Sequence, residues 1–320
     1  MILKKACSYI FVLVLVLSMT ACAGEQTAFS LDDCASMLME AIPEPAYGSV
    51  SGEWAALGLA RWGGEVPQEW FEGYYEAVEN HVAACEGVLD NRKYTEYARV
   101  ILALTAIGKD PTDVGGYDLV LPLADFEQTV FQGINGPIFA LLALDSRNYE
   151  IPENVAGTTQ ATRELYIAYI LDRELPGGGW SLAGGEAEID ITAMALQALA
   201  KYRDRQDVAD AVDRGLVVLS EQQNENGGYT AYDADSSETV SQVIVALTEL
   251  GISVEDPRFV KNGNTLKDRL LDFLAEDNGF RHVPEGETDL IATEQAFYAL
   301  VAIRRAEQGK TSLYDMADVR

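Results

Sequence analysis

The chain has few basic residues. Its 23 Lys and Arg stand against 51 Asp and Glu, which gives a formal net charge of −28 at pH 7. A surface this acidic repels phosphate backbones and anionic lipid headgroups. We therefore exclude nucleic acid as a partner. Any membrane attachment would have to come from a lipid anchor rather than from a basic patch.

The first residues contain no apolar stretch long enough to span a bilayer. The run Tyr9–Leu17 follows Lys4 and Lys5 and is well short of the roughly 20 residues that a membrane-spanning helix needs. Small residues then precede Cys22, an arrangement that resembles a bacterial lipobox. The alternative is an ordinary signal peptide that is cut near Ala23.

These features predict how the chain is divided. We expect a lipoprotein signal peptide over residues 1–21, a lipidated Cys22 with a short tether over 22–29, and one domain over 30–320. The protein would then be exported and anchored to the outer face of the bacterial cell membrane through the lipid alone.

Cysteine is scarce as well. Of four cysteines, Cys7 falls in the signal and Cys22 would carry the lipid, which leaves Cys34 and Cys85. Because disulfides persist in exported proteins, we expect these two to pair. The alternative is two buried free thiols.

One loop pattern occurs three times in the second half of the chain. The segments "LPGGGW", "QNENGGY" and "EDNGF" end at Trp180, Tyr229 and Phe280. Each is followed, nine or ten residues later, by an acidic residue that begins an apolar helical segment. Glycine ends one helix, and an acid near the next helix start meets its free amides and the positive end of its dipole. These acids are Asp190, Glu238 and Asp289.

Aligning the apolar segments on a small residue followed by leucine extends the repeat over the whole domain. The spacings between successive pairs are 45, 40, 55, 48 and 53 residues. The six pairs begin at Gly58, Ala103, Ala143, Ala198, Ala246 and Ala299.

Six more polar segments with helical periodicity lie between the apolar ones. They cover 30–41, 68–87, 123–131, 158–172, 206–223 and 266–275. A helix that is apolar on every face is buried on every face, so the apolar segments form an inner layer and the amphipathic ones an outer layer. No stretch shows sustained strand alternation. Because neither terminal repeat has the polar face that caps an open solenoid, we predict an all-α fold, an α/α toroid of six helical hairpins.

At this point the sequence resembles a known superfamily. "QNENGGY" and "LPGGGW" resemble the repeats of squalene–hopene cyclases and protein prenyltransferase β subunits, which are α/α toroids. "DITAMALQALA", residues 190–200, is similar to an inner helix of the cobalamin-binding α-domain of transcobalamin and intrinsic factor. "ATEQAFYALVAI" and "LYDM" resemble the last repeat of related bacterial surface proteins. The resemblance covers residues 54–316 and implies a toroid, with a corrinoid as one implied ligand.

The catalytic motifs of these relatives are not found. The aspartate-rich D-x-D-D signature of the cyclases has its nearest counterpart in "DADSSE", where Ser236 replaces the last aspartate. At the prenyltransferase zinc position, Asp190 is followed by Thr192 in place of cysteine, and His81 and His282 are the only histidines. No zinc site can be assembled from these residues.

We therefore expect a protein that binds a small apolar, corrinoid-like or sugar-like ligand without catalysing a reaction on it. Aromatic walls with a few carboxylates at the ring centre suit such a ligand, and a buried amide on an apolar helix needs a partner. A cell-surface partner protein could take the place of the ligand, or complete a corrinoid site by supplying the β domain found in transcobalamin. The candidate ligand-binding residues are Trp180, Asp190, Tyr229, Tyr232, Glu238, Gln242, Phe280, Asp289 and Gln295.

Two alternatives remain open. The first is a carbohydrate- or cell-wall-active enzyme that uses rim carboxylates, since Asp190, Glu238 and Asp289 each begin an inner helix at the same end of the ring. Such an enzyme should show an open groove with opposed carboxylates and a raised pKa in one of them. The second is an interaction scaffold that uses the outer surface of the ring.

Overall fold

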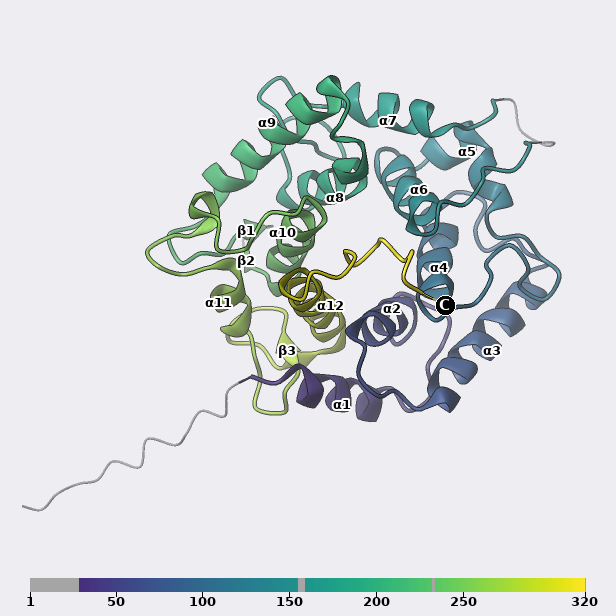
Figure 1. Ribbon diagram of the computed structural model, residues 1–320, viewed down its shortest axis with the longest axis horizontal. Coiled ribbons are helices and arrows are strands. Elements are labelled where there is room, and N and C mark those ends of the chain that lie inside the picture. The colour runs from purple at the N-terminus through teal and green to yellow at the C-terminus, as the bar shows by residue number, and fades with distance from the viewer. Residues whose placement is uncertain (1–28, 155–158, 232–233, 320) are drawn as a thin grey trace, which may run out of the picture.

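The computed structural model describes residues 29–154, 159–231 and 234–319. Twelve α-helices in this part of the chain alternate between two concentric layers (Figure 1). The expected signal peptide and Cys22 lie outside the described residues. No helix within the described ranges is long and apolar enough to cross a membrane.

The even-numbered helices form the inner layer (Figure 1). Each contacts the next even-numbered helix, and α12 contacts α2, so the ring is closed. The inner helices are α2 (Glu53–Trp62), α4 (Thr95–Ala106), α6 (Asn135–Ser146), α8 (Ile189–Leu199), α10 (Ser237–Glu249) and α12 (Leu290–Glu307).

The odd-numbered helices surround this ring. The first of them, α1, packs on the last inner helix, α12, and so completes the outer layer where the chain ends meet (Figure 1). The outer helices are α1 (Leu31–Ala41), α3 (Gln68–Ala84), α5 (Phe126–Val130), α7 (Arg163–Leu171), α9 (Gln206–Gln222) and α11 (Leu266–Leu271). Short 3₁₀ segments lie at Leu121–Ala124, Ala200–Tyr202 and Pro257–Phe259. The predicted toroid of six inner and six outer helices is confirmed.

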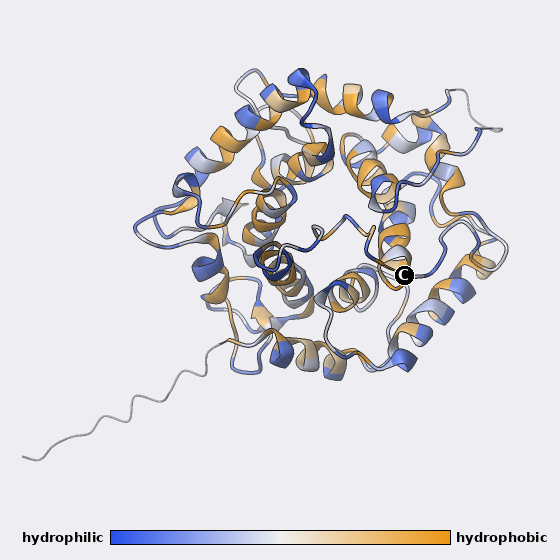
Figure 2. Ribbon diagram, viewed as in Figure 1, coloured by the Kyte–Doolittle hydropathy of each residue, from blue (hydrophilic) through white to orange (hydrophobic). Residues whose placement is uncertain are grey.

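The two layers differ in hydropathy as the sequence indicates (Figure 2). The inner helix α6 buries nine of its twelve residues, because neighbouring helices cover almost every side. The outer helix α9 buries a single stripe, which includes Val208, Val212 and Leu219, and turns charged residues to solvent.

The aromatic residues of the repeated loops fill the ends of the hairpins. Trp180, Tyr229 and Phe280 are fully buried. The indole Nε1 of Trp180 donates to the carbonyl of Ile170 at 2.8 Å, and the hydroxyl of Tyr229 donates to the carbonyl of Leu219 at 3.0 Å. These side chains therefore fix each inner helix to the outer layer.

Two of the loops contain short β-ribbons that the sequence did not predict. β1 (Thr230–Ala231) pairs with β2 (Ala234–Asp235), and β3 (Phe280–Arg281) pairs with β4 (Thr288–Asp289), both antiparallel. Two residues per strand are too few for an alternating pattern to be visible in a sequence. The ribbons supply hydrogen-bond partners to the backbone where it reverses before an inner helix.

The predicted disulfide is not present, because Cys34 and Cys85 are both free. Cys34 is buried on α1, and burial raises the pKa of its thiol to about 12. Cys85 follows the last residue of α3, where its Sγ lies 3.5 Å from the carbonyl oxygen of Val82. Each sulfur atom therefore stays with a different outer helix, that of Cys34 with α1 and that of Cys85 with the end of α3.

Candidate functional site

The register of the repeat shows which side chains face the centre of the ring. Positions four, seven and eleven residues after a given residue lie on the same face of a helix. Applied to the six repeats, this spacing defines successive layers of side chains, here called tiers, from the N-terminal to the C-terminal ends of the inner helices. The first or rim tier consists of Thr95, Asn135, Asp190, Glu238 and Ile291, with Val50 of the turn before α2 at the equivalent position of the aligned repeat. The second tier consists of Trp54, Arg99, Phe139, Met194, Gln242 and Gln295.

Exposure changes sharply between the second tier and the third. All twelve side chains of the first two tiers are at least partly exposed. Every member of the third tier is buried, so this tier closes the centre of the ring. Its members are Leu57, Leu102, Leu142, Gln197, Val245 and Tyr298. We call the N-terminal ends of the inner helices, where solvent reaches two tiers, the open end.

The other end of the ring, here the closed end, is covered by the C-terminal segment 308–319 (Figure 1). Arg61 on α2 donates to the carbonyls of Ser312, Leu313 and Asp315. Its guanidinium also pairs with Asp318 at 2.6 Å. The segment is therefore fastened across the C-terminal ends of the inner helices by a buried arginine.

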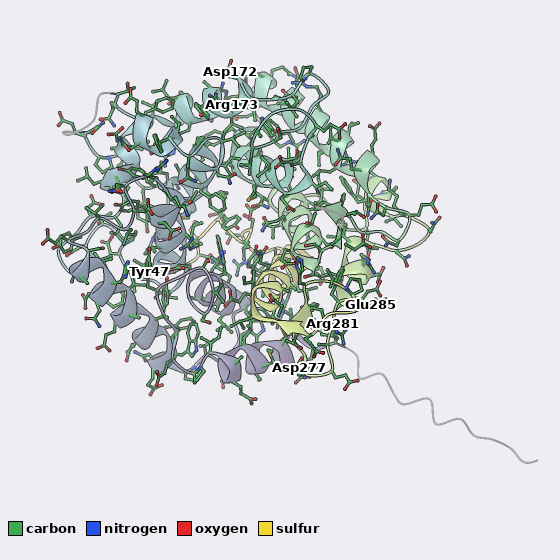
Figure 3. The ribbon with its side chains drawn as sticks, turned by 180° about the vertical axis from the view of Figure 1, so that it is seen from behind. Tyr47, Asp172, Arg173, Asp277, Arg281 and Glu285 are labelled. Carbon is green, nitrogen blue, oxygen red and sulfur yellow. The ribbon has the colours of Figure 1, made fainter. Side chains whose placement is uncertain are left out.

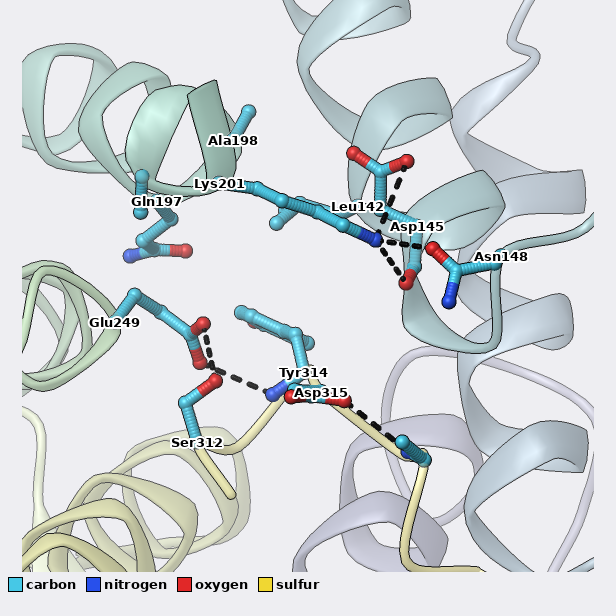
Figure 4. A pocket seen from close by; sticks show the side chains of 12 residues that line it. Leu142, Asp145, Asn148, Gln197, Ala198, Lys201, Glu249, Ser312, Tyr314 and Asp315 are labelled. Carbon is cyan, nitrogen blue, oxygen red and sulfur yellow. Dashed lines mark hydrogen bonds and ion pairs between the residues drawn. The ribbon is translucent and has the colours of Figure 1, made fainter. Parts of the chain in front are cut away.

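A pocket of about 330 Å³ lies beneath this segment, between α6, α8 and α10 (Figure 4). The carboxyl of Glu249 accepts hydrogen bonds there from the Ser312 hydroxyl at 2.6 Å and the Tyr314 amide at 3.0 Å. Burial raises the pKa of Glu249 to about 7. On the opposite wall, the Lys201 ammonium lies 2.5 Å from the amide oxygen of Asn148 (Figure 4).

At the open end, two carboxyl groups occupy the same rim position in successive inner helices. Asp190 lies in the first turn of α8, and Glu238 lies in the first turn of α10. Burial raises the pKa of Asp190, the charges of Glu238 and Glu188 raise it further, and a hydrogen bond with Thr239 opposes them. Among the described residues, Asp190 Oδ1 is buried without a hydrogen-bond partner.

Glu238 has a different environment. Its Oε2 accepts hydrogen bonds from the hydroxyls of Ser236 and Ser237, each at 3.0 Å. The Nδ1 of His282 lies 2.8 Å from Glu238 Oε1. Two neighbouring carboxyl groups therefore differ in burial and in hydrogen-bond partners.

The second tier contains both apolar and polar side chains. Trp54 lies 6.2 Å from Phe139 and 5.9 Å from Tyr298, measured between ring centroids. Because α4 separates α2 from α6 in the ring, the contact between Trp54 and Phe139 passes in front of the inner face of α4. Met194 on α8 is a further apolar member of the tier.

Arg99 lies on α4, between the helices of Trp54 and Phe139, and is neutralised by two carboxylates. It pairs with Glu53 at 3.0 Å and with Glu96 at 2.6 Å. Tyr47 donates its hydroxyl to Glu96 and stacks on His81 with ring centroids 3.7 Å apart. Seen from behind, Tyr47 lies inside the outer layer, beside α3 (Figure 3).

The glutamines that the sequence singled out bond mainly to one another. Gln197 Nε2 donates to the carbonyl and to the side-chain oxygen of Gln242, at 2.9 and 3.0 Å. Gln242 Nε2 donates in turn to Gln295 Oε1 at 3.0 Å and to the Tyr298 hydroxyl at 2.8 Å. This chain of amides links α8, α10 and α12 beneath the rim carboxyl groups.

The structure thus brings together part of the predicted site. Asp190, Glu238, Gln242 and Gln295 converge at the open end. Asp289 caps α12 by accepting from the amide of Ala292 at 2.9 Å.

The other predicted residues lie elsewhere. The structure gives Trp180, Tyr229 and Phe280 packing roles within the hairpins in place of the predicted ligand contacts, because none of them is exposed. Tyr232 lies outside the described residues.

The predicted role of the acids as helix caps also needs correction for two of the three helices. The N-cap of α10 is Ser236, which accepts from the amide of Thr239, and the N-cap of α8 is Glu188. Asp190 and Glu238 lie within the first turn instead, which leaves their carboxyl groups free for other contacts.

Sequence reasoning did not select Phe139, Arg99 and Asn135. The repeat register contains the signal that finds them, since each occupies a rim or second-tier position. No group of three or more His, Cys, Asp or Glu that could hold a metal ion occurs within the described ranges.

Comparison with known proteins identifies the fold. No protein-family model matches the sequence, and no curated protein matches it. Among solved structures, a UGL variant named together with the saccharide dGlcA-Glc-Rha-Glc superimposes with a TM-score of 0.58 at 12% identity, covering 89% of this chain and 97% of that one.

A second solved structure is an unsaturated glucuronyl hydrolase from a Bacillus species, described as responsible for the degradation of glycosaminoglycan. It superimposes with a TM-score of 0.56 at 11% identity, over 89% of this chain and 97% of that one. Both neighbours share the α/α toroid, which is also the fold of the terpenoid cyclase superfamily. Membership of the prenyltransferase and cyclase families is not confirmed.

Proposed function

We propose that this protein is a carbohydrate-active hydrolase that cleaves a glycosidic bond at the open end of the ring. The observation that carries the proposal is the pair Asp190 and Glu238, which lie at the same rim position of consecutive inner helices in unlike environments. Glycoside hydrolysis uses a pair of carboxyl groups, one of which has a raised pKa and serves as the acid.

Asp190 is assigned the role of general acid. Because its pKa is raised, the carboxyl group of Asp190 stays protonated at a higher pH than that of an ordinary aspartate. Its proton passes to the oxygen of the leaving sugar. Glu238 acts as the general base that takes a proton from the attacking water, whose oxygen bonds to the anomeric carbon as the glycosidic bond breaks. The two serine hydroxyls and His282 orient Glu238, and the N-terminal end of α10 favours its negative charge.

The second tier would hold the sugar beneath these groups. Trp54 and Phe139 present partly exposed aromatic surface, and the apolar face of a sugar ring packs well on such surfaces. Opposite them, the amides of Gln242 and Gln295 can orient the hydroxyl groups. The sugar would therefore lie between an aromatic wall and a polar wall.

The solved neighbours support this proposal over non-catalytic binding, which the sequence favoured. One is described as responsible for the degradation of glycosaminoglycan, and the other is named together with a saccharide. Both superimpose over nearly the full ring.

The test is release of sugar from a panel of fluorogenic α- and β-glycosides and cell-wall oligosaccharides. We expect Asp190→Asn to lower kcat/KM by at least ~10²-fold, since general acid catalysis contributes about that much. Asp172→Asn is the matched control, because Asp172 lies at the outer edge of the molecule with a side chain 85% exposed (Figure 3). Sugar binding without turnover in the unchanged protein would instead support a non-catalytic ligand-binding protein.

We further propose that the protein is exported and anchored by a lipid on Cys22. The lipobox-like residues before Cys22 motivate this proposal. Detergent phase partitioning of the full chain and of Cys22→Ala tests it. The unchanged chain is expected in the detergent phase and the variant in the aqueous phase, and equal partitioning would contradict the anchor.

A further inference from the structure

We infer that the sugar unit bound at the open end carries no carboxylate or sulfate, and is neutral or amine-bearing. This inference rests on the proposed function and concerns the substrate of the same site. It separates this protein from the solved neighbours, one of which is named a glucuronyl hydrolase.

The first argument is the balance of charge around the site. Arg99 is the one cation among the twelve side chains of the rim and second tiers. Two carboxylates, Glu53 and Glu96, pair with its guanidinium. Asp190 and Glu238 add two further carboxyl groups at the rim. An anionic sugar would therefore meet a net negative charge without a free cation to bind it.

The second argument concerns the converging helix ends. Six helix N-termini meet at the open end, and their dipoles alone would favour an anion. Four of the inner helices already carry an acid in their first turn, and α12 has Asp289 as its N-cap. The first-turn acids are Glu53, Glu96, Asp190 and Glu238. Five of the six positive helix ends are thus matched by acids of the protein itself, and α6 is the exception.

The third argument is the kind of hydrogen bond that remains to be made. Within the described ranges, four buried oxygens near the starts of the inner helices have no hydrogen-bond partner. They belong to Asn135, Glu188, Asp190 and Glu294. The amide oxygen of Asn135 can only accept a hydrogen bond. Asp190 and Glu294 have raised pKa values, that of Glu294 to about 8, so a proton on either carboxyl group can be donated instead. A hydroxyl or ammonium group can donate to the Asn135 oxygen, whereas a carboxylate or sulfate only accepts.

The experiment compares three monosaccharides that differ in charge. Binding of glucose, glucosamine and glucuronate to the mature protein is measured by ligand-observed NMR at pH 7 and low salt. We expect glucose and glucosamine to bind at least tenfold more tightly than glucuronate, and the difference to narrow in 0.5 M NaCl because salt screens the repulsion. Hydrolysis of fluorogenic glycosides of the same three sugars, in both anomeric forms, is measured in parallel.

A charge variant tests the cause of the discrimination. Glu96→Gln removes one of the two carboxylates that pair with Arg99. The ratio of the glucose affinity to the glucuronate affinity should then fall at least threefold. Glu225→Gln removes the same charge from an exposed loop and should leave the ratio unchanged. An unchanged ratio in Glu96→Gln would overturn the charge argument.

The outcomes separate this inference from the proposed function. If glucuronate binds as tightly as glucose, the substrate inference is overturned. If any glycoside is also cleaved, the proposed hydrolase function still stands. Failure to bind or cleave any of the sugars overturns both. Tight binding of neutral and amine-bearing sugars, with weak binding of glucuronate, supports the inference whether or not these particular glycosides are cleaved.

Discussion

The two ends of the ring are built from the same six inner helices, yet they differ in how their polar groups are satisfied. At the closed end, Arg61 and Glu249 make their hydrogen bonds to the C-terminal segment. At the open end, buried oxygens of Asp190 and Asn135 have no partner within the described residues. Buried polar groups are normally paired, so a group that the chain leaves unpaired is available to a ligand. The comparison therefore assigns stability to one end and binding to the other.

The largest expected effect is a loss of stability when the C-terminal segment loses its contacts with the closed end. Arg61→Ala leaves three carbonyls of the segment without this donor, although Asp318 keeps its pair with Arg305, and each buried acceptor left unpaired costs about 1–3 kcal/mol. Urea unfolding of the two proteins measures this loss. Arg304→Ala is the matched control, because Arg304 is 38% exposed and its pair with Asp32 spans 3.6 Å. Equal stability of Arg61→Ala and the unchanged protein would show that the segment does not fasten this end.

The next prediction compares two glutamates on one inner helix. Glu238 and Glu249 lie at opposite ends of α10. Glu238→Gln should lower kcat/KM for a cleaved glycoside by at least ~10²-fold, because it removes the activating carboxylate. Glu249→Gln should retain activity within about threefold, because its hydrogen bonds serve the closed end. Equal losses in both variants would contradict the assignment of catalysis to the open end.

Much of this division could be predicted from the sequence, because both layers follow from periodicity. Helices that are apolar all round must lie inside, and repeats of similar length must stack, so the ring follows without side-chain detail. Gln242 and Gln295 could be selected because amides are rare on such helices, and Asp190 because it follows a loop that recurs.

The sequence was less informative about the direction in which the aromatic side chains point. It placed Trp180, Tyr229 and Phe280 at the ligand because they lie near the helix starts, but their side chains turn outward into the hairpins. An aromatic residue next to glycine packs equally well on either side of a loop. Trp54 and Phe139 face the centre because of their position in the helical register, which only the aligned repeats reveal.

A third prediction uses pH to compare the ends. Burial raises the pKa of Glu249 to about 7 and that of Glu294 to about 8, from an ordinary value of 4.5. A raised pKa means that the folded state holds the proton more tightly than the unfolded state. Stability should therefore be highest at or below about pH 4.5 for these groups and fall as pH rises toward 8.

The loss should be about 1–3 kcal/mol, less than the full shifts imply because solvent and relaxation reduce the cost of the charge. Urea unfolding at several pH values measures it. Glu249→Gln should remove the part of the loss below pH 7, whereas Glu294→Gln should remove the part that continues to pH 8. Identical pH profiles for the two variants would mean that the carboxyl groups do not titrate separately.

The smallest expected effect concerns the outer layer, which packing alone should hold in place at both ends. Cys34 and Cys85 are free, so a reducing agent should change the free energy of unfolding by less than ~0.5 kcal/mol, whereas loss of a native disulfide typically costs about 2–5 kcal/mol. Unfolding with and without dithiothreitol measures the difference, and Cys85→Ser should behave as the unchanged protein does in reducing conditions. A loss of several kcal/mol on reduction would restore the predicted disulfide, because α1 would then depend on a covalent link in addition to its packing against α12.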